Sequence, residues 1–461
     1  MLNSCSKPTA FFNNIGQKLK PFFYGKYYPA VVALVTAMLY HANLSLLGLG
    51  FFAFFATVQL LFFRDLTAFI PLPIFAVLVL PDFSVFNSFA TFIVLSVPFI
   101  ALVLHFIIYP IKKVFIGKVF FSLVAVSVAL LLGGICSPHN VKYAYGLVTA
   151  LTVGALMLFA YFLFTNYYCP PDDFDAGEYF CFMLLCLGGT LFFESLIPAV
   201  REANTFGWGS TNTSASLLLL SIPAGWYLVL YKKDVLLNLP LLVIQYVALV
   251  FAKSDACLGI VFVMTPVFLL VALIIGKVPK TKRFVLFTLL SLFAIALIVC
   301  GGILGYSEQA RIWTADRLSL MLDDNGRSKF YKKAVEEFLH YPLFGVGQGY
   351  MNDEFRLTLT GVITFNFHST FFHVLATMGT VGVLAYAYYY FSRIRAFTAE
   401  NTAFSRFSFL AFIMLQAYGA VDTSEFNVVP IMMTLTLFMV VVEMTAKTKK
   451  PILPLWNNRL G

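Results

Sequence analysis

Long apolar runs separated by short polar segments make up most of the chain. Each run is close to the length of about 20 residues that a helix needs to cross the hydrocarbon of a bilayer. We therefore predict about 14 transmembrane helices, with about 12 as the lower bound. Their expected positions are residues 29–46, 47–63, 66–86, 89–110, 119–135, 143–165, 179–198, 213–231, 235–252, 256–276, 284–305, 368–391, 406–421 and 427–445.

The composition agrees with a lipid environment. Hydrophobic residues make up 60% of the 461 residues, charged residues make up only 11%, and the mean hydropathy is +0.86. A soluble domain is about a quarter charged, so this chain cannot cover its surface with polar groups. The net charge of +9 comes from Lys and Arg at the ends of the apolar runs. We therefore expect an all-α polytopic membrane protein that contacts membrane lipids and no nucleic acid.

The distribution of positive charge predicts the orientation. With the N-terminus in the cytoplasm, about two thirds of the 31 Lys and Arg residues lie on the cytoplasmic side, in agreement with the positive-inside rule. Arg393 and Arg395 belong to this cytoplasmic set. The chain then divides into a cytoplasmic N-terminal segment 1–28, helices 1–11 within 29–305, a large outer loop 306–367, helices 12–14 within 368–445 and a cytoplasmic tail 446–461.

The long outer loop has a helical pattern at its centre. Phe330, Ala334, Phe338 and Tyr341 recur at helical spacing, with Lys and Glu on the opposite face. Pro342 and the glycines that follow it end this pattern. We predict an amphipathic helix that lies on the outer surface of the membrane.

The outer loops also concentrate the polar chemistry. Arginines beside a bilayer are natural receptors for phosphate, because a guanidinium stays charged and binds an anion with two donors. Arg201 lies in one such loop, although a lone interfacial arginine more often only reaches toward water. Arg317 and Arg327 lie in the long loop, where such charges are usually just solvated.

Two histidines follow the long loop. His368 lies at the start of a predicted helix, whose dipole favours the neutral imidazole, so a role as a general base and a structural role are both open. His373 lies about 140° further around the helix, and we interpret it as a packing residue. We see no cluster at metal-ligand spacing, so no metal or cofactor is predicted.

Several motifs occur in a characteristic order on the outer side. Asn325-Gly326-Arg327 is followed by His340-Tyr341-Pro342-Leu343-Phe344-Gly345-Val346-Gly347, then by His368-Ser369-Thr370-Phe371-Phe372 and by Gly379-Thr380-Val381-Gly382. This order resembles the O-antigen ligase and O-antigen polymerase superfamily. The resemblance extends more weakly to the loop from Arg201 to Asn212 and to Gly419…Asp422.

The resemblance implies transfer of a glycan from an undecaprenyl-diphosphate carrier to an acceptor hydroxyl on a glycan or a lipid core. It implies a type C-like glycosyltransferase that inverts the anomeric centre without a metal, in the bacterial cytoplasmic membrane. Arg327, with Arg317 as a second candidate, would bind the diphosphate, and His368 would orient or deprotonate the acceptor. The expected binding residues are Arg201, Lys253, Arg317, Asn212 and Asp422.

The chain departs from the family pattern at three places. Ser369 stands where the family has Asn, and Phe330 or Tyr331 stands in place of a Trp. Many members carry Ser-Arg-Gly-Ala in the third outer loop, where this chain has Lys253-Ser254-Asp255-Ala256. Lys253 would supply the positive charge as a point charge rather than as a fork.

Other functions remain open at this stage. The sequence does not separate a polymerase from a ligase, although a polymerase needs only a second lipid-linked repeat unit. A flippase or another polytopic transporter would also suit the helix number. Transporters tend to place charges within their spans, whereas the predicted spans here are nearly free of charge. A non-catalytic scaffold of an envelope complex is a third reading.

Overall fold

The protein is described by a computed structural model. The structure describes residues 7–79, 88–140, 143–196, 205–206, 209–275, 278–309, 311–312, 315, 327–350, 367–427, 429–446 and 452–454. Helices account for most of these residues, so the all-α class is confirmed. Two short antiparallel pairings accompany them, β1 (Lys113–Phe115) with β4 (Ile452–Pro454) and β2 (Thr205–Phe206) with β3 (Gly209–Ser210).

The helices follow the apolar runs of the sequence. Each predicted span contains a helix, and a further helix precedes the first span. In chain order they are α1 (Lys7–Phe23), α2 (Tyr27–His41), α3 (Ser45–Phe62), the short η1 (Thr67–Phe69), α4 (Pro71–Leu78), α5 (Phe89–Ile108), α6 (Phe120–Leu132), α7 (Tyr143–Thr149), the π-helical η3 (Ala150–Leu156), α8 (Met157–Asn166), α9 (Ala176–Ser195), α11 (Thr211–Tyr231), α12 (Val235–Phe251), α13 (Asp255–Ile275), α14 (Lys280–Tyr306), α16 (Arg327–His340), α17 (Thr370–Phe397), α18 (Ala403–Gly419), α19 (Ser424–Asn427) and α20 (Val429–Thr445).

Among the described residues, seven helices are long and apolar enough to cross a membrane. They are Ser45–Phe62, Phe89–Ile108, Gly146–Asn166, Ala176–Ser195, Asn212–Tyr231, Asp255–Ile274 and Thr370–Phe397. The pair Asn14–Phe23 and Tyr27–His41, bent by 70°, would make an eighth span if it is one broken helix. The protein is therefore a polytopic membrane protein.

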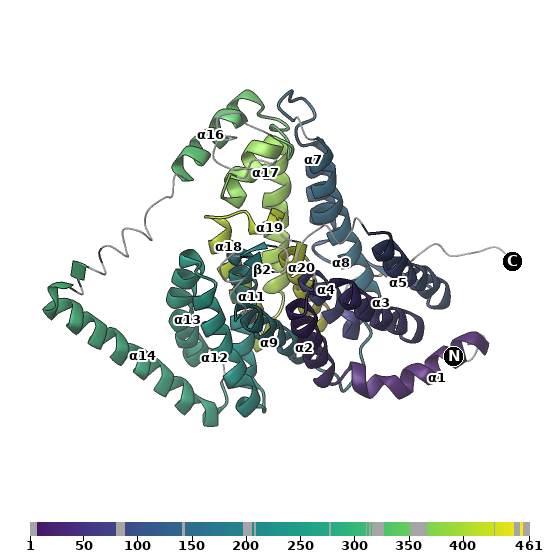
Figure 1. Ribbon diagram of the computed structural model, residues 1–461, viewed down its shortest axis with the longest axis horizontal. Coiled ribbons are helices and arrows are strands. Elements are labelled where there is room, and N and C mark those ends of the chain that lie inside the picture. The colour runs from purple at the N-terminus through teal and green to yellow at the C-terminus, as the bar shows by residue number, and fades with distance from the viewer. Residues whose placement is uncertain are drawn as a thin grey trace.

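The helices pack around a central group. Nearly all described residues of α9 and α11 are buried, whereas α5 and α13 expose large apolar side chains along much of their length. Figure 1 shows α14 at the edge of the molecule, where it packs mainly against α13. Figure 1 also shows α16 and the start of α17 together at one end of the bundle.

The predicted amphipathic helix is present as α16. Its buried face carries Ala334, which has no exposed surface, and Tyr331, whose ring stacks on that of Phe372 with centroids 4.4 Å apart. This face packs on α17. The start of α17 therefore covers this face, and the position of α16 at the outer membrane surface stays a prediction.

α17 is broken at Gly379, which has φ +61° and ψ −154°. In an unbroken helix, the N–H groups of residues 380 and 381 would bond to the carbonyls of residues 376 and 377. Here those carbonyls accept hydrogen bonds from residues 346 and 347 instead, at 2.8 and 2.9 Å. The N–H groups of residues 380 and 381 donate to the carbonyls of residues 342 and 343, at 2.8 and 3.2 Å.

We call the segment 342–347 the clasp, because its backbone satisfies all four polar groups that the break leaves open. A Cβ atom at Gly379 would lie 2.6 Å from the carbonyl carbon of Leu343, and one at Gly345 would lie 2.3 Å from the carbonyl oxygen of Ala376. Both glycines also have positive φ. The twelfth span was predicted as one continuous helix, which is wrong, because the clasp separates it into residues 370–378 and 380–397.

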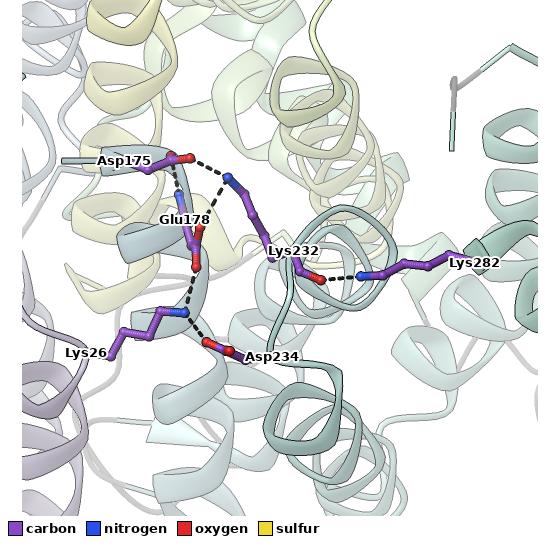
Figure 2. Close-up of polar contacts among 6 residues, drawn as sticks. All are labelled: Lys26, Asp175, Glu178, Lys232, Asp234 and Lys282. Carbon is purple, nitrogen blue, oxygen red and sulfur yellow. Dashed lines mark hydrogen bonds and ion pairs between the residues drawn. The ribbon is translucent and has the colours of Figure 1, made fainter. Parts of the chain in front are cut away.

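Ion pairs tie several chain segments together near Lys232, which directly follows the end of α11 (Figure 2). Lys26 Nζ lies 2.6 Å from Glu178 Oε1 and 2.5 Å from Asp234 Oδ2, and Lys232 Nζ lies 3.2 Å from Glu178 Oε2. Lys282 Nζ donates to backbone carbonyls at the end of α11. Segments before α2, before α9, after α11 and at the start of α14 therefore share one face. The sequence had assigned all of them to the same side.

A buried ion pair lies among α17, α18 and α19. Arg393 NH1 lies 3.2 Å from each carboxylate oxygen of Glu425, and neither side chain is more than 1% exposed. The guanidinium carbon lies 4.1 Å from the ring centroid of Tyr389 and 4.4 Å from that of Tyr390. Gln416 Nε2 donates to Glu425 Oε1 at 2.5 Å.

This pair corrects two expectations. Arg393 had been assigned to the cytoplasmic surface, whereas its partner Glu425 lies in the turn that carries Asp422, which was expected on the outer side. The hydrocarbon between those surfaces is about 30 Å thick. Both side chains instead reach into the bundle. The spans are also less free of charge than expected, because Glu194 on α9 is buried as well, without a hydrogen-bond partner in the described part of the chain.

Replacing Gly379 with Ala is expected to destabilise the protein. A residue with a side chain that is held at this positive φ loses about 1–3 kcal/mol of unfolding free energy. The added Cβ would also collide with the clasp. We expect a lower midpoint of thermal unfolding in detergent and loss of part of the folded fraction. Gly259→Ala is the matched control, because a Cβ there meets no atom within 4 Å. Equal midpoints for the two variants would contradict the described role of the clasp.

The ion pair can be tested by a double-mutant cycle. Arg393→Met or Glu425→Met alone leaves one charge buried without its partner, which typically costs about 3–5 kcal/mol of unfolding free energy. The double variant should cost much less than the sum, and the exposed Arg395→Met should change stability by less than about 0.5 kcal/mol. Additive single effects, measured by denaturant unfolding, would show that the two side chains do not interact.

Candidate active site

His368 lies in the turn that enters α17, directly before its first helical residues. Its backbone has φ +50°, a left-handed conformation that is uncommon for a residue with a side chain. The hydroxyl of Tyr331 donates to the carbonyl oxygen of His368 at 3.3 Å, and the ring of Phe330 contacts the imidazole edge-on, with centroids 5.0 Å apart. Two neighbouring residues of α16 therefore fix a strained turn, as is common at functional sites.

Charge and burial both act on this imidazole. Burial lowers the pKa of His368 below its usual value, and the positive charge of Arg327 lowers it further. The carboxylate of Asp422 acts in the opposite direction and raises the pKa. The neutral form was predicted from the helix dipole, whereas the structure gives burial as the main cause. Arg327 and Asp422 thus both lie within electrostatic reach of His368, although the three residues are far apart in the sequence.

Asp422 lies in the turn between α18 and α19 and is held from several directions. Tyr418, one helical turn earlier, donates its hydroxyl to Asp422 Oδ2 at 2.6 Å. Asn212, at the start of α11, lies 3.5 Å from the same oxygen. Thr370, at the start of α17, donates its hydroxyl to the backbone carbonyl of Asp422 at 3.2 Å. The starts of α11 and α17 and the end of α18 therefore meet at Asp422, two of them through its carboxylate and α17 through its backbone carbonyl.

Lys253 lies in the turn between α12 and α13, on the same face. Its φ is +51°, which is a frequent conformation directly after the end of a helix. The side chain is exposed, whereas the neighbouring Ser254 is buried. Cys257, one turn into α13, lies within electrostatic reach of Asp422. The beginning of α13 therefore borders the same cluster, and the Lys253 ammonium is available to an anion beside it.

The predicted site residues differ in where the structure places them. It brings together Arg327, His368, Asp422 and Asn212, with Lys253 at the border. Arg201 and Arg317 lie outside the described residues. His373 was interpreted as packing, and it is 3% exposed with its Nε2 2.8 Å from Gln348 Oε1.

Sequence reasoning missed Tyr418 and Thr370. The spacing of four residues between Tyr418 and Asp422 could have indicated the first contact. Thr370 bonds to a backbone carbonyl, and no sequence pattern signals such a contact.

An apolar cavity of about 380 Å³ adjoins the polar cluster. It lies where the two parts of α17 meet the end of α18, and Thr370 lines it at the side of the cluster. Val374, Val383 and Ala387 contribute to its apolar wall, and Tyr386 also lines it. A ligand with a charged head and an apolar tail would match a polar cluster that continues into such a cavity.

Comparison with known families agrees with the motifs. Residues 240–387 match the family model described as O-antigen ligase. The match begins within α12, includes Lys253, Arg327 and His368, and ends in the second part of α17, so Asn212 and Asp422 lie outside it. None of the curated proteins compared with the chain matches it. Residues 240–387 are therefore similar to the O-antigen ligase family, which supports the superfamily that the motifs resemble.

Proposed function

We propose that the protein transfers or polymerises glycan from an undecaprenyl-diphosphate carrier onto an acceptor hydroxyl, at the outer face of the bacterial cytoplasmic membrane. The match of residues 240–387 to the O-antigen ligase family supports a membrane glycan ligase or polymerase in general terms. The observation that carries the finer proposal is the meeting of Arg327, His368 and Asp422 beside an apolar cavity.

The arrangement supports a direct displacement. The acceptor oxygen forms a bond to the anomeric carbon, and the bond from that carbon to the diphosphate oxygen breaks, which inverts the anomeric centre. The diphosphate leaves with the electron pair. Arg327 and Lys253 stabilise the negative charge that develops on it, and neutral His368 accepts the proton of the acceptor hydroxyl. Asp422 stabilises the imidazolium that results.

The cavity suits the lipid part of such a donor. The first prenyl units would lie against Val374 and Val383, and the diphosphate would remain at the polar edge near Thr370. Holding the donor in two places orients its anomeric carbon toward His368, and orientation alone contributes much of the rate in such reactions.

The proposed topology has about 14 spans with both termini in the cytoplasm. The ion-pair face of Figure 2 would then be cytoplasmic. The candidate site lies at the other end of α11, about 30 Å away for a helix of this length. In this arrangement, the large loop 306–367 carries Arg327 to the outer face.

The activity can be tested with the purified protein in nanodiscs. An undecaprenyl-diphosphate repeat unit is supplied as the only glycan, with a chelator present, and the products are separated on a gel. A ladder of longer chains would identify a polymerase. A single transfer seen only after addition of a lipid-core acceptor would identify a ligase. Movement of the substrate across the membrane without a covalent product would instead indicate a transporter.

Replacement of the proposed base and of the phosphate-binding arginine should abolish most of this activity. We expect His368→Ala and Arg327→Gln each to lower turnover at least about 100-fold, which is typical for the loss of a general base or of an electrostatic stabiliser. Arg311→Gln is the control, because Arg311 is exposed in the long loop outside the cluster. Full activity of both site variants, in protein that remains folded, would exclude the assigned roles.

The pH dependence provides a test with a defined sign. Because the pKa of His368 is lowered, kcat/KM should fall only below about pH 6.5, as the imidazole becomes protonated. Asp422→Asn removes a charge that raises this pKa, so the acid limb should move to lower pH. Arg327→Gln removes a charge that lowers it, so the limb of the residual activity should move to higher pH. Shifts in the same direction for both variants would contradict the arrangement.

A further inference from the structure

A second apolar cavity lies between α13 and α18, away from the candidate active site. Its volume is about 300 Å³, and its walls are formed by apolar side chains that include Val267, Val271, Phe407 and Leu410. Among the described residues that line it, Arg406 is the one that carries a charge. Val267 is 52% exposed and Val271 is 43% exposed, so the cavity is open at the surface of the bundle.

The position of the cavity along the helices matches one leaflet of a bilayer. Its lining runs from Met264 to Ala272 on α13 and from Arg406 to Ile413 on α18. At a rise of about 1.5 Å per residue, each stretch is about 10–12 Å long. Half of the hydrocarbon core is about 15 Å thick. A single acyl chain could therefore follow this cavity through most of one leaflet.

Arg406 lies at the end of the cavity that faces the ion-pair network of Figure 2. Tyr231, which also lines the cavity there, directly precedes Lys232 of that network. Asn401 holds the guanidinium, since its side-chain oxygen accepts from Arg406 Nε at 2.8 Å and its carbonyl accepts from NH2 at 3.4 Å. A fixed cation at the head-group level, above an apolar groove, matches an amphiphile with an anionic head.

We propose that this groove binds an anionic phospholipid from the leaflet on the Lys232 side, with the phosphate on Arg406 and an acyl chain between α13 and α18. This site is separate from the candidate active site, which borders the opposite end of α13. The bound lipid would fill the space between two helices of the bundle. The edge helix α14 packs mainly on α13, so the lipid would also hold this pair of helices to the rest of the molecule.

The test uses the full-length protein in detergent, stripped of lipid and titrated with phosphatidylglycerol or phosphatidylcholine of identical acyl chains, with binding read by native mass spectrometry. We expect phosphatidylglycerol to bind about 5- to 10-fold more tightly, as one basic residue at a membrane surface contributes about that much. Arg406→Gln should remove the preference. Arg395→Gln, an exposed arginine of α17 that does not line the groove, should retain it.

Two further variants distinguish lipid binding in the groove from a general effect of charge or of folding on lipid binding. Val267→Trp places a bulky side chain on the exposed wall and should weaken binding of both lipids while the thermal midpoint without lipid is kept. Glu400→Gln removes the acidic residue that is nearest to Arg406 in the sequence. This variant should bind phosphatidylglycerol at least as tightly as the unaltered protein does.

Equal affinity for the two lipids would overturn the proposal. So would an equal loss of the preference for phosphatidylglycerol in the Arg406→Gln and Arg395→Gln variants. Displacement of phosphatidylglycerol by a much smaller amount of undecaprenyl phosphate would also overturn it, because the groove would then belong to the carrier lipid. Because binding is measured without any glycan, failure of the proposed glycan transfer would leave this result unaffected.

Discussion

The backbone hydrogen bonds between the clasp and the break in α17 determine where most of the candidate site lies. Four polar groups that a continuous helix would satisfy internally are satisfied by residues 342–347. The clasp directly follows α16 and His368 directly precedes α17, so the same bonds set α16 against the start of α17. They also separate the short outer part of α17 from its longer part, and the cavity forms where these two parts meet α18. Without Gly345 and Gly379, these backbones could not approach so closely.

Most helices could be predicted from the sequence because lipid imposes a simple pattern. An apolar run of about 20 residues has few alternatives to a helix in a bilayer, and charged residues between runs mark the turns. The break in α17 could not be predicted in this way, since residues on both sides of Gly379 are equally apolar. Arg393 was misplaced because a basic residue near the end of a span usually faces the cytoplasm. Its partner Glu425 comes from a turn whose depth in the membrane depends on how α18, α19 and α20 pack.

The candidate site also contains some residues that the sequence indicates and others whose contacts depend on how the helices pack. The sequence indicated His368, Arg327 and Asp422 through motifs, and the structure places Arg327 and Asp422 within electrostatic reach of the imidazole. The contacts that hold Asp422, from Tyr418 and Thr370, depend on the packing of α17 against α18, and a single sequence carries little sign of them. The family match ends within α17, so the turn that carries Asp422 lies outside it, and the packing of α18 against α17 brings this turn to the site. The site is thus built from the starts of α11, α13, α16 and α17 and from the end of α18.

The most direct test of this account is a cryo-electron microscopy structure of the protein in nanodiscs with an undecaprenyl-diphosphate glycan bound. The account predicts the diphosphate between Arg327 and Lys253, the first prenyl units in the cavity beside Thr370, and the anomeric carbon facing His368. A diphosphate bound elsewhere, with His368 and Arg327 out of contact with the donor, would contradict the assignment of this cluster as the active site.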